Sequence, residues 1–265
     1  MSLEIRSGDL KRAAEVMLAA EAGVTARGPI TEQWPDLDLD TAYAVQYEAL
    51  RQRQRRGETL IGVKLGLTSR AKQIRMGIDS PSLAWLTDAM VLPAGEPLPR
   101  ERLIHPRAEP EIVFVMGERL AGPGVTASTA LKAVDRVYGG VEIIDSRFQD
   151  FKFTLADAVA DNSSSGLFVQ GPVGKSALDL DLSHEACLLE VDGEIVDAAT
   201  GAAVQGHPAE ALALAANHLG ARGLAIEAGW IVLTGGMTDA VHVRPGARVA
   251  AHFSNLGSIT IPGGE

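Results

Sequence analysis

The apolar stretches of this chain are short, and they recur at irregular intervals. Runs of strand length lie at residues 60–66, 111–116 and 141–145, separated by segments of unequal length. A doubly wound parallel sheet requires strands and helices in regular alternation, which this spacing does not provide. We therefore expect a mixed α+β fold, rich in β-structure, whose mostly antiparallel sheet curls on itself.

Two segments near the N-terminus are predicted to be helices rather than strands, because their apolar residues recur at helical spacing. The first covers residues 8–25, and the second covers residues 41–50, with Asp40 as its N-cap and Gly57 as its end. We expect these helices to form a small N-terminal helical extension over residues 1–58, packed on a β-roll catalytic domain over residues 59–265. Further expected elements are helices at residues 127–137 and 208–220, a hairpin at residues 188–195, and strands at residues 229–233, 248–253 and 258–261.

Composition and charge exclude several classes of protein. The formal net charge is −10, and the basic run at residues 51–56 has no interleaved aromatic residues. We interpret this run as a solvated helix face rather than a nucleic-acid site. No apolar stretch approaches the roughly 20 residues of a membrane helix. The single cysteine, Cys187, rules out an internal disulfide and, with no secretory signal pattern, indicates a cytoplasmic protein.

The strongest chemical signal is an acidic cluster at the start of an apolar strand. Glu109 and Glu111 are two residues apart, so in an extended backbone they project from the same face. Two carboxylates this close raise each other's pKa unless a cation lies between them, although a solvated strand end would also accommodate the pattern. A third acid, Glu142, favours the cation, because it lies within an apolar strand where an unpaired glutamate is costly to bury.

Three carboxylates, with open positions for water or substrate, suit Mg²⁺ or Mn²⁺, since both ions prefer hard oxygen ligands. We therefore expect one such ion on Glu109, Glu111 and Glu142. His105 precedes this cluster by four residues, and we expect it to orient the loop as a hydrogen-bond donor rather than to bind the metal.

Several separate motifs, in order along nearly the whole chain, resemble the fumarylacetoacetate hydrolase superfamily. Within it the chain looks like the branch of 4-oxalocrotonate decarboxylases and 2-hydroxypenta-2,4-dienoate hydratases of catechol meta-cleavage, an aromatic hydrocarbon catabolism. The motifs lie at residues 62–69, 86–90, 105–112, 141–147, 159–165, 206–208 and 233–236. The resemblance implies a β-roll with Mg²⁺ or Mn²⁺ on the three glutamates, in agreement with the carboxylate argument.

Residues 145–153 and 234–241 look more like the decarboxylase than the hydratase. The resemblance thus implies a lyase that converts 2-oxohex-3-enedioate (4-oxalocrotonate), a small 2-oxo dicarboxylic acid, to 2-hydroxypenta-2,4-dienoate and CO₂. The metal would polarise the 2-oxo group and stabilise the charge that develops as CO₂ leaves. The sister hydratase, a carbon–oxygen lyase, stays open as an alternative, as does an acylpyruvate hydrolase.

Further residues are candidates for contact with the substrate. Lys64, in an apolar strand, would contact a carboxylate or oxyanion or transfer a proton, with Asp88 as its partner in proton handling. Ser164, in a polar loop, would hydrogen-bond a substrate carboxylate, and Arg147 or else Lys152 would recognise the distal carboxylate. From the residues alone, Lys64 could equally extend to the surface, and Asp88 could cap a turn.

The sequence argues against a serine hydrolase and against nucleotide binding. The chain has neither the Gly-x-Ser-x-Gly elbow of the first nor the phosphate-binding glycine loop of the second. The resemblance implies a homo-oligomer and allows a complex with the sister enzyme. A non-catalytic partner in such a complex is the remaining alternative, and the presence of all three acids with Lys64 argues against it.

Overall fold

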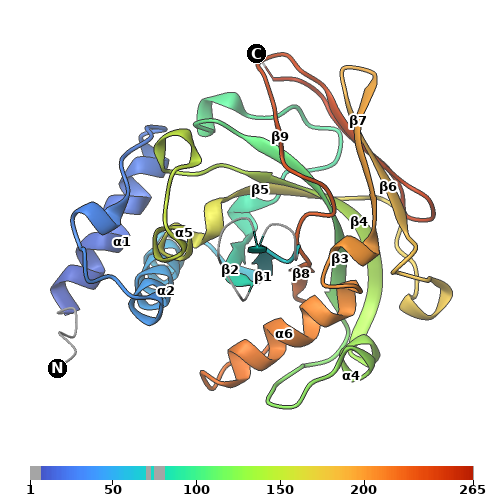
Figure 1. Ribbon diagram of the computed structural model, residues 1–265, viewed down its shortest axis with the longest axis horizontal. Helices are drawn as coiled ribbons and strands as arrows, with labels where there is room; N and C mark the ends of the chain where they lie inside the picture. The colour runs from blue at the N-terminus through green and yellow to red at the C-terminus, as the bar shows by residue number, and fades with distance from the viewer. Residues whose placement is uncertain (1–6, 70–72, 75–80, 265) are drawn as a thin grey trace.

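The computed structural model describes residues 7–69, 73–74 and 81–264. Its strands form two curled sheets, with helices at one side and along one end (Figure 1). The larger sheet has seven strands in the order β2-β1-β8-β3-β4-β5, with β9 also paired to β3, and the smaller has the order β11-β10-β6-β7. The strands are β1 (Leu60–Gly66), β2 (Ser82–Thr87), β3 (Arg107–Met116), β4 (Val134–Ile144), β5 (Ser165–Gln170), β6 (Ala186–Val191), β7 (Glu194–Thr200), β8 (Ile231–Leu233), β9 (Val241–His242), β10 (Val249–Phe253) and β11 (Gly257–Ile261). The expected mixed, β-rich fold is confirmed.

Five α-helices lie in the described part of the chain. They are α1 (Ser7–Ala22), α2 (Leu39–Arg55), α4 (Ala127–Lys132), α5 (Leu155–Ala160) and α6 (Pro208–Gly220). None of them is both long and apolar enough to cross a membrane. The N-cap of α2 is Asp38, whose carboxylate accepts a hydrogen bond from the Thr41 backbone N–H at 2.8 Å, so the prediction of Asp40 as the cap was wrong by two residues.

The predicted helix at residues 127–137 is too long. Helix α4 ends at Lys132, and β4 begins at Val134. The reason is that β4 pairs with β3 from Val134 opposite Met116 to Ile144 opposite Arg107. A ladder of this length outweighs the weak local preference for helix at the start of β4.

Two glycines allow the sheets to approach closely. A side chain at Gly139 in β4 would lie 2.5 Å from the ring of Phe253, so the absence of one lets β10 pack tightly against β4. A side chain at Gly62 in β1 would lie 2.0 Å from the Ile231 carbonyl oxygen, so glycine is required where β1 pairs in parallel with β8. The first contact joins the two sheets, and the second joins neighbouring strands of the larger sheet.

Helices α1 and α2 pack on the body through α5 (Figure 1). Ala13, Met17 and Val45 from these helices share one buried apolar cluster with Phe148 and Val159. The cluster therefore joins the N-terminal helices to a later part of the chain. The boundary between residues 58 and 59 stays a prediction.

Gln46 is expected to hold α2 on the body. Its buried Nε2 donates to the backbone oxygens of Leu83 in β2 and Val159 in α5, both at 2.9 Å. Replacing Gln46 by Leu leaves both carbonyls without this donor, and each buried orphaned acceptor costs about 1–3 kcal/mol. Urea unfolding should show this loss, whereas the exposed Gln54→Leu in the same helix should change stability by less than about 0.5 kcal/mol. Equal effects of the two variants would contradict this role.

Candidate metal centre and active site

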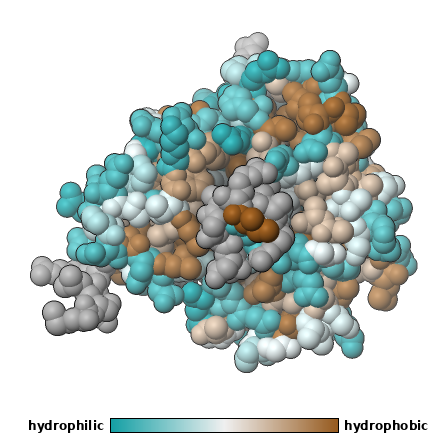
Figure 2. Space-filling model, in the orientation of Figure 1, coloured by the Kyte–Doolittle hydropathy of each residue, from teal (hydrophilic) through white to brown (hydrophobic). Residues whose placement is uncertain are grey.

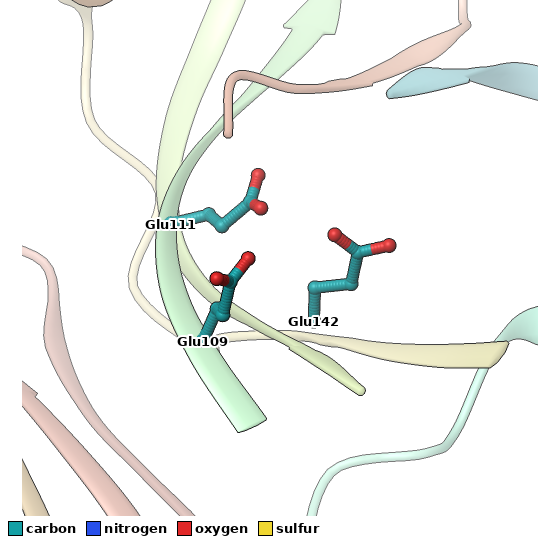
Figure 3. Close-up of side chains that lie close together, drawn as sticks. All are labelled: Glu109, Glu111 and Glu142. Carbon is teal, nitrogen blue, oxygen red and sulfur yellow. The ribbon is translucent and has the colours of Figure 1, made fainter. Parts of the chain in front are cut away.

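Three glutamates converge inside the larger sheet. Glu109 and Glu142 face each other directly across the β3–β4 ladder, and Glu111 follows on the same face of β3. One carboxylate oxygen from each lies within 4.8 Å of the others, and Figure 3 shows the three side chains pointing toward one another. Like charges directly opposite on neighbouring strands repel, so this cluster requires a compensating cation.

Lys64 supplies part of that charge. Its ammonium lies 2.7 Å from Glu142 Oε1, and both side chains are almost completely buried. Strand β1 brings Lys64 here because it lies two places from β3 in the sheet, with β8 between them. When all four groups are ionised, the three carboxylates and one ammonium carry a net charge of −2. A divalent ion would neutralise them.

The loop after β8 closes the other side of the cluster. The backbone N–H of Gly235 donates to Glu111 Oε2 at 2.7 Å, while Glu111 Oε1 is buried with no hydrogen-bond partner in the described part of the chain. Burial first, and then the charges of Glu142 and Glu109, raise the pKa of Glu111 well above its usual range. Burial likewise raises the pKa of Glu142, against the opposing effect of Lys64.

These observations fit a hard divalent cation. A buried carboxylate oxygen without a partner is rare in folded proteins and calls for a ligand. Three carboxylate donors suit Mg²⁺ or Mn²⁺ and do not suit a soft metal. The residues present therefore fit the metal that their sequence pattern predicts, with Glu109, Glu111 and Glu142 as the groups that would hold it.

A cavity of about 130 Å³ opens beside the cluster. Lys64, Glu109 and Glu142 line one end of it. Because a water needs roughly 10–15 Å³ of such space, the cavity holds about ten waters or one small organic acid. Its remaining walls divide into a polar group and an apolar group. The polar wall includes Thr68, Ser82, Ser163 and Ser164, and the apolar wall includes Ile144, Phe151, Phe153 and Ala158.

Ser164 lies in the polar wall, on a strained turn. The turn η5 (Asn162–Ser164) has φ values of 49°, 49° and 57°, a left-handed conformation that costs roughly 1–2 kcal/mol for each residue. Asn162 holds the turn against β2, since its side chain bonds the backbone N–H and C=O of Trp85, both at 2.9 Å. Strain that surrounding bonds maintain beside a cavity is typical of a functional site. Sequence reasoning identified Ser164 but missed Asn162.

The structure does not bring Asp88 to the cavity. Lys64 lies opposite Ala84 on the β1–β2 ladder, whereas Leu60 lies opposite Thr87. Asp88 therefore follows the far end of β2, where it is exposed and accepts a hydrogen bond from the Thr59 backbone N–H at 2.9 Å. The expected pairing of Asp88 with Lys64 is wrong, and the partner of Lys64 is Glu142.

Arg147 is also placed differently from the prediction. It is buried in an ion pair with Asp161, and its Nη1 donates to the backbone oxygens of Asp145 at 2.6 Å and Ser165 at 2.8 Å. Nε and Nη2 are likewise bonded to Asp161. With these groups engaged by protein, Arg147 holds the backbone around the site. Lys152, its alternative, is 81% exposed and lies 3.6 Å from Asp150.

His105 packs against the cavity wall. Its ring centroid lies 4.7 Å from that of Phe151, and its backbone N–H donates to Asp145 at 2.7 Å. It is not among the converging ligand atoms. Phe151 and Phe153 are two residues apart, and sequence reasoning left them without a role although both line the cavity.

Gly236 is expected to control the position of Glu109. A Cβ at Gly236 would lie 2.7 Å from Glu109 Cδ and Oε2, so Gly236→Ala should push the flexible end of that side chain away from the cluster. We expect Mn²⁺ affinity, measured by calorimetry, to fall about tenfold or more, as for other groups that orient metal ligands. Unfolding should change little. Gly8→Ala, where no atom lies within 4 Å, is the matched control, and unchanged Mn²⁺ affinity in Gly236→Ala would contradict this role.

Metal binding is expected to strengthen as pH rises. Because the pKa of Glu111 is raised, the metal-free protein keeps a proton there to a higher pH than an exposed glutamate does, and a cation must displace that proton. Mn²⁺ titrations at several pH values, in buffers of different ionisation enthalpy, should show proton release. Between the pKa of Glu111 in the unfolded chain and its higher pKa in the folded protein, the folded state binds more protons than the unfolded state. Without metal, the free energy of unfolding should therefore fall as pH rises through this range. A pH-independent affinity would contradict the assignment.

Comparison with known proteins agrees with this geometry. A family model described as fumarylacetoacetate (FAA) hydrolase C-terminal matches residues 59–262. A 4-oxalocrotonate decarboxylase of Pseudomonas sp. (strain CF600) is 41% identical over 247 residues, covering 93% of this chain and 94% of that protein. A 2-hydroxyhexa-2,4-dienoate hydratase of Comamonas testosteroni is 38% identical over 235 residues, covering 88% of this chain and 89% of that protein.

A solved structure is similar over almost the whole length. The 4-oxalocrotonate decarboxylase from Pseudomonas putida G7, complexed with magnesium and adipate, superposes with a TM-score of 0.95 at 38% identity, covering 97% of this chain and 98% of that one. The expected family and the expected pair of activities are thus borne out by its relatives. On the family match across residues 59–262 and on these relatives, the chain belongs to the fumarylacetoacetate hydrolase family.

Proposed function

We propose that the chain is a divalent-metal-dependent lyase that decarboxylates 4-oxalocrotonate to 2-hydroxypenta-2,4-dienoate and CO₂. The observation that carries the proposal is the convergence of Glu109, Glu111 and Glu142 beside buried Lys64 at the end of a small cavity. The 41% identity to a 4-oxalocrotonate decarboxylase over nearly the full length of both chains supports the choice of reaction.

A bound divalent ion would supply Lewis acidity toward the 2-oxo acid end of the substrate. In the reaction, the bond between C5 and the C6 carboxylate breaks, and its electron pair passes along the conjugated chain to the C2 oxygen. Lys64 would stabilise the negative charge that develops there or hold the proton that neutralises it, because its ammonium lies at the cavity end next to Glu142.

The remaining walls suit the two ends of such a substrate. Ser164, 5% exposed and on the polar wall, would donate a hydrogen bond to a carboxylate of the substrate in place of its long contact with Asp161 Oδ2 at 3.5 Å. Ile144, Phe151 and Phe153 on the apolar wall exclude water. A poorly solvated carboxylate loses CO₂ more readily than a hydrated one, since the charged group gives way to a neutral product.

We infer that the resident ion is Mg²⁺, with Mn²⁺ able to replace it. The three carboxylates suit both ions. The relative from Pseudomonas putida G7 was solved with magnesium and, separately, with calcium. Manganese appears in a more distant fumarylpyruvate hydrolase of the same fold.

We also propose a homo-oligomer in a reducing cytoplasm, with association to the sister hydratase as a further partner. Cys187 is the only cysteine and is a buried free thiol, which is consistent with a reducing compartment.

Exposed apolar side chains on the β6–β7 hairpin support the oligomer. Leu188, Ile195 and Val196 expose 42%, 52% and 47% of their surface there, and Figure 2 shows apolar surface on this side of the molecule. A subunit contact would cover these side chains.

The hydratase is the second candidate, because relatives named as hydratases are 36–42% identical to the chain. It would protonate and hydrate the same dienol, so it uses the same metal and the same Lys64. The two reactions differ in their substrates, since the decarboxylase takes a dicarboxylate and the hydratase takes a monocarboxylate.

Purified protein with Mg²⁺ should release CO₂ from 2-oxohex-3-enedioate faster than it consumes 2-hydroxypenta-2,4-dienoate. A CO₂ electrode and the ultraviolet absorbance of the dienol measure the two rates. Chelation should abolish activity, and Lys64→Met should lower kcat by about 10²-fold or more.

Loss of dienol without CO₂ release would assign the hydratase, and cleavage of an acylpyruvate would assign the hydrolase. Metal binding without any of these activities would point to a non-catalytic partner, and absence of metal binding would overturn the site itself.

A further inference from the structure

A dicarboxylate substrate needs a group that recognises its second carboxylate. Arg147 is engaged by Asp161 and backbone oxygens, and Lys152 is exposed beside Asp150, so neither side chain faces the cavity. The recognition group must be a cation near the cavity wall that the protein itself leaves uncommitted. Among the described residues, Arg107 comes nearest to this condition, because it stacks behind the wall residue Phe151 although it does not itself line the cavity.

Arg107 lies on the face of the sheet that carries the metal ligands. It is two residues before Glu109 on β3, and it is opposite Ile144, just as Glu109 is opposite Glu142. Ile144 itself lines the cavity. With a rise of about 3.3–3.4 Å per residue, the Arg107 backbone lies roughly 7 Å from that of Glu109, a span comparable to that of a six-carbon diacid.

The guanidinium of Arg107 is held by an aromatic ring rather than by an acid. Its Cζ lies 3.8 Å from the centroid of the Phe151 ring, and Phe151 lines the cavity. Within the described part of the chain, its buried Nε has no hydrogen-bond partner and no acidic side chain forms an ion pair with Arg107. A planar cation stacked on a ring keeps its charge available for a second anion.

Other basic groups strengthen the positive field at this end of β3. His242 is paired with Arg107 across the β3–β9 ladder. Arg100, His105 and Arg244 lie close enough, together with Arg107, to lower the pKa of His242 beyond the larger effect of its burial. A local positive field in a chain with net charge −10 favours approach of a dianion to this end of the site.

We propose that Arg107 and Phe151 form the subsite for the distal carboxylate. The inference rests on the proposed function and specifies how its substrate is selected. The Phe151 ring presents an apolar surface to the carboxylate, and the Arg107 cation behind that ring attracts the negative charge without clamping it in a bidentate ion pair. Such attraction is lost as the carboxylate becomes neutral CO₂, so it supports binding and selection of the dianion rather than the chemical step. Because it is weaker than a bidentate ion pair, it raises the barrier to departure less than such a pair would.

The test compares two non-reacting ligands, 2-oxoadipate and 2-oxohexanoate, which differ only in the distal carboxylate. Calorimetry on the Mg²⁺-loaded protein should show at least tenfold tighter binding of 2-oxoadipate. In Arg107→Met, which keeps a long side chain without charge, the preference should fall below about threefold through loss of 2-oxoadipate affinity alone. Arg107→Lys, which retains the charge, should keep most of it. Arg119→Gln, at a 59% exposed arginine beyond the opposite end of β3, is the matched control and should behave as the wild type.

The outcomes separate the two proposals. A wild-type preference that persists in Arg107→Met overturns the subsite, and so does equal loss of both ligands. Should Arg107→Met not fold, as judged by its unfolding transition and Mn²⁺ affinity, loss of the preference in Arg107→Lys overturns the subsite and retention supports it. A wild-type protein that binds both ligands equally, with no CO₂ release from 4-oxalocrotonate, sinks the proposed function instead.

Discussion

Repulsion between carboxylates across the β3–β4 pair is the constraint on which the site depends. Glu109 and Glu142 lie directly opposite each other, with Glu111 on the same face, in an interior where charge is expensive. Lys64 offsets one of these charges at 2.7 Å, so the four groups carry a net charge of −2 once all three acids are ionised. The arrangement is unfavourable for the protein alone and favourable when a divalent ion lies among the carboxylates, so the larger sheet brings together a group of side chains that a metal would stabilise.

The surrounding chain is shaped to keep these carboxylates in place. Gly235 donates its backbone N–H to Glu111, and Gly236 leaves the room in which the Glu109 carboxylate lies. On the opposite wall, Asn162 fixes a turn of left-handed residues that presents Ser164 to the cavity. The small residues and the strained backbone at this site position the carboxylates and Ser164, and they do not add to the stability of the fold.

Some charged residues near the site are fully hydrogen-bonded by the protein and others are not, and the sequence does not distinguish the two kinds. Arg147 and Arg107 are both arginines close to a metal-ligand strand. Asp161 and backbone oxygens accept the hydrogen bonds of Arg147, whereas Arg107 stacks on Phe151 and its Nε has no partner among the described residues. A buried, fully bonded guanidinium supports the backbone, and an uncommitted one can meet a ligand. Asp88 illustrates the same difficulty, because only strand register shows that it lies at the wrong end of β2.

Sequence by itself determined the β-rich class, the helix at residues 208–220, most of the helix expected at residues 8–25, which ends at Ala22, and the convergence of the three glutamates. The cavity positions of Lys64 and Ser164 were implied by the family resemblance. Side-chain alternation, helical periodicity and the cost of burying an acid are local signals that a single segment carries. The tertiary structure decided where α4 gives way to β4, which cations stay uncommitted and which residues wall the cavity. These outcomes depend on strand register and on contacts between segments far apart in the chain. Such pairing cannot be predicted from the sequence of either segment alone.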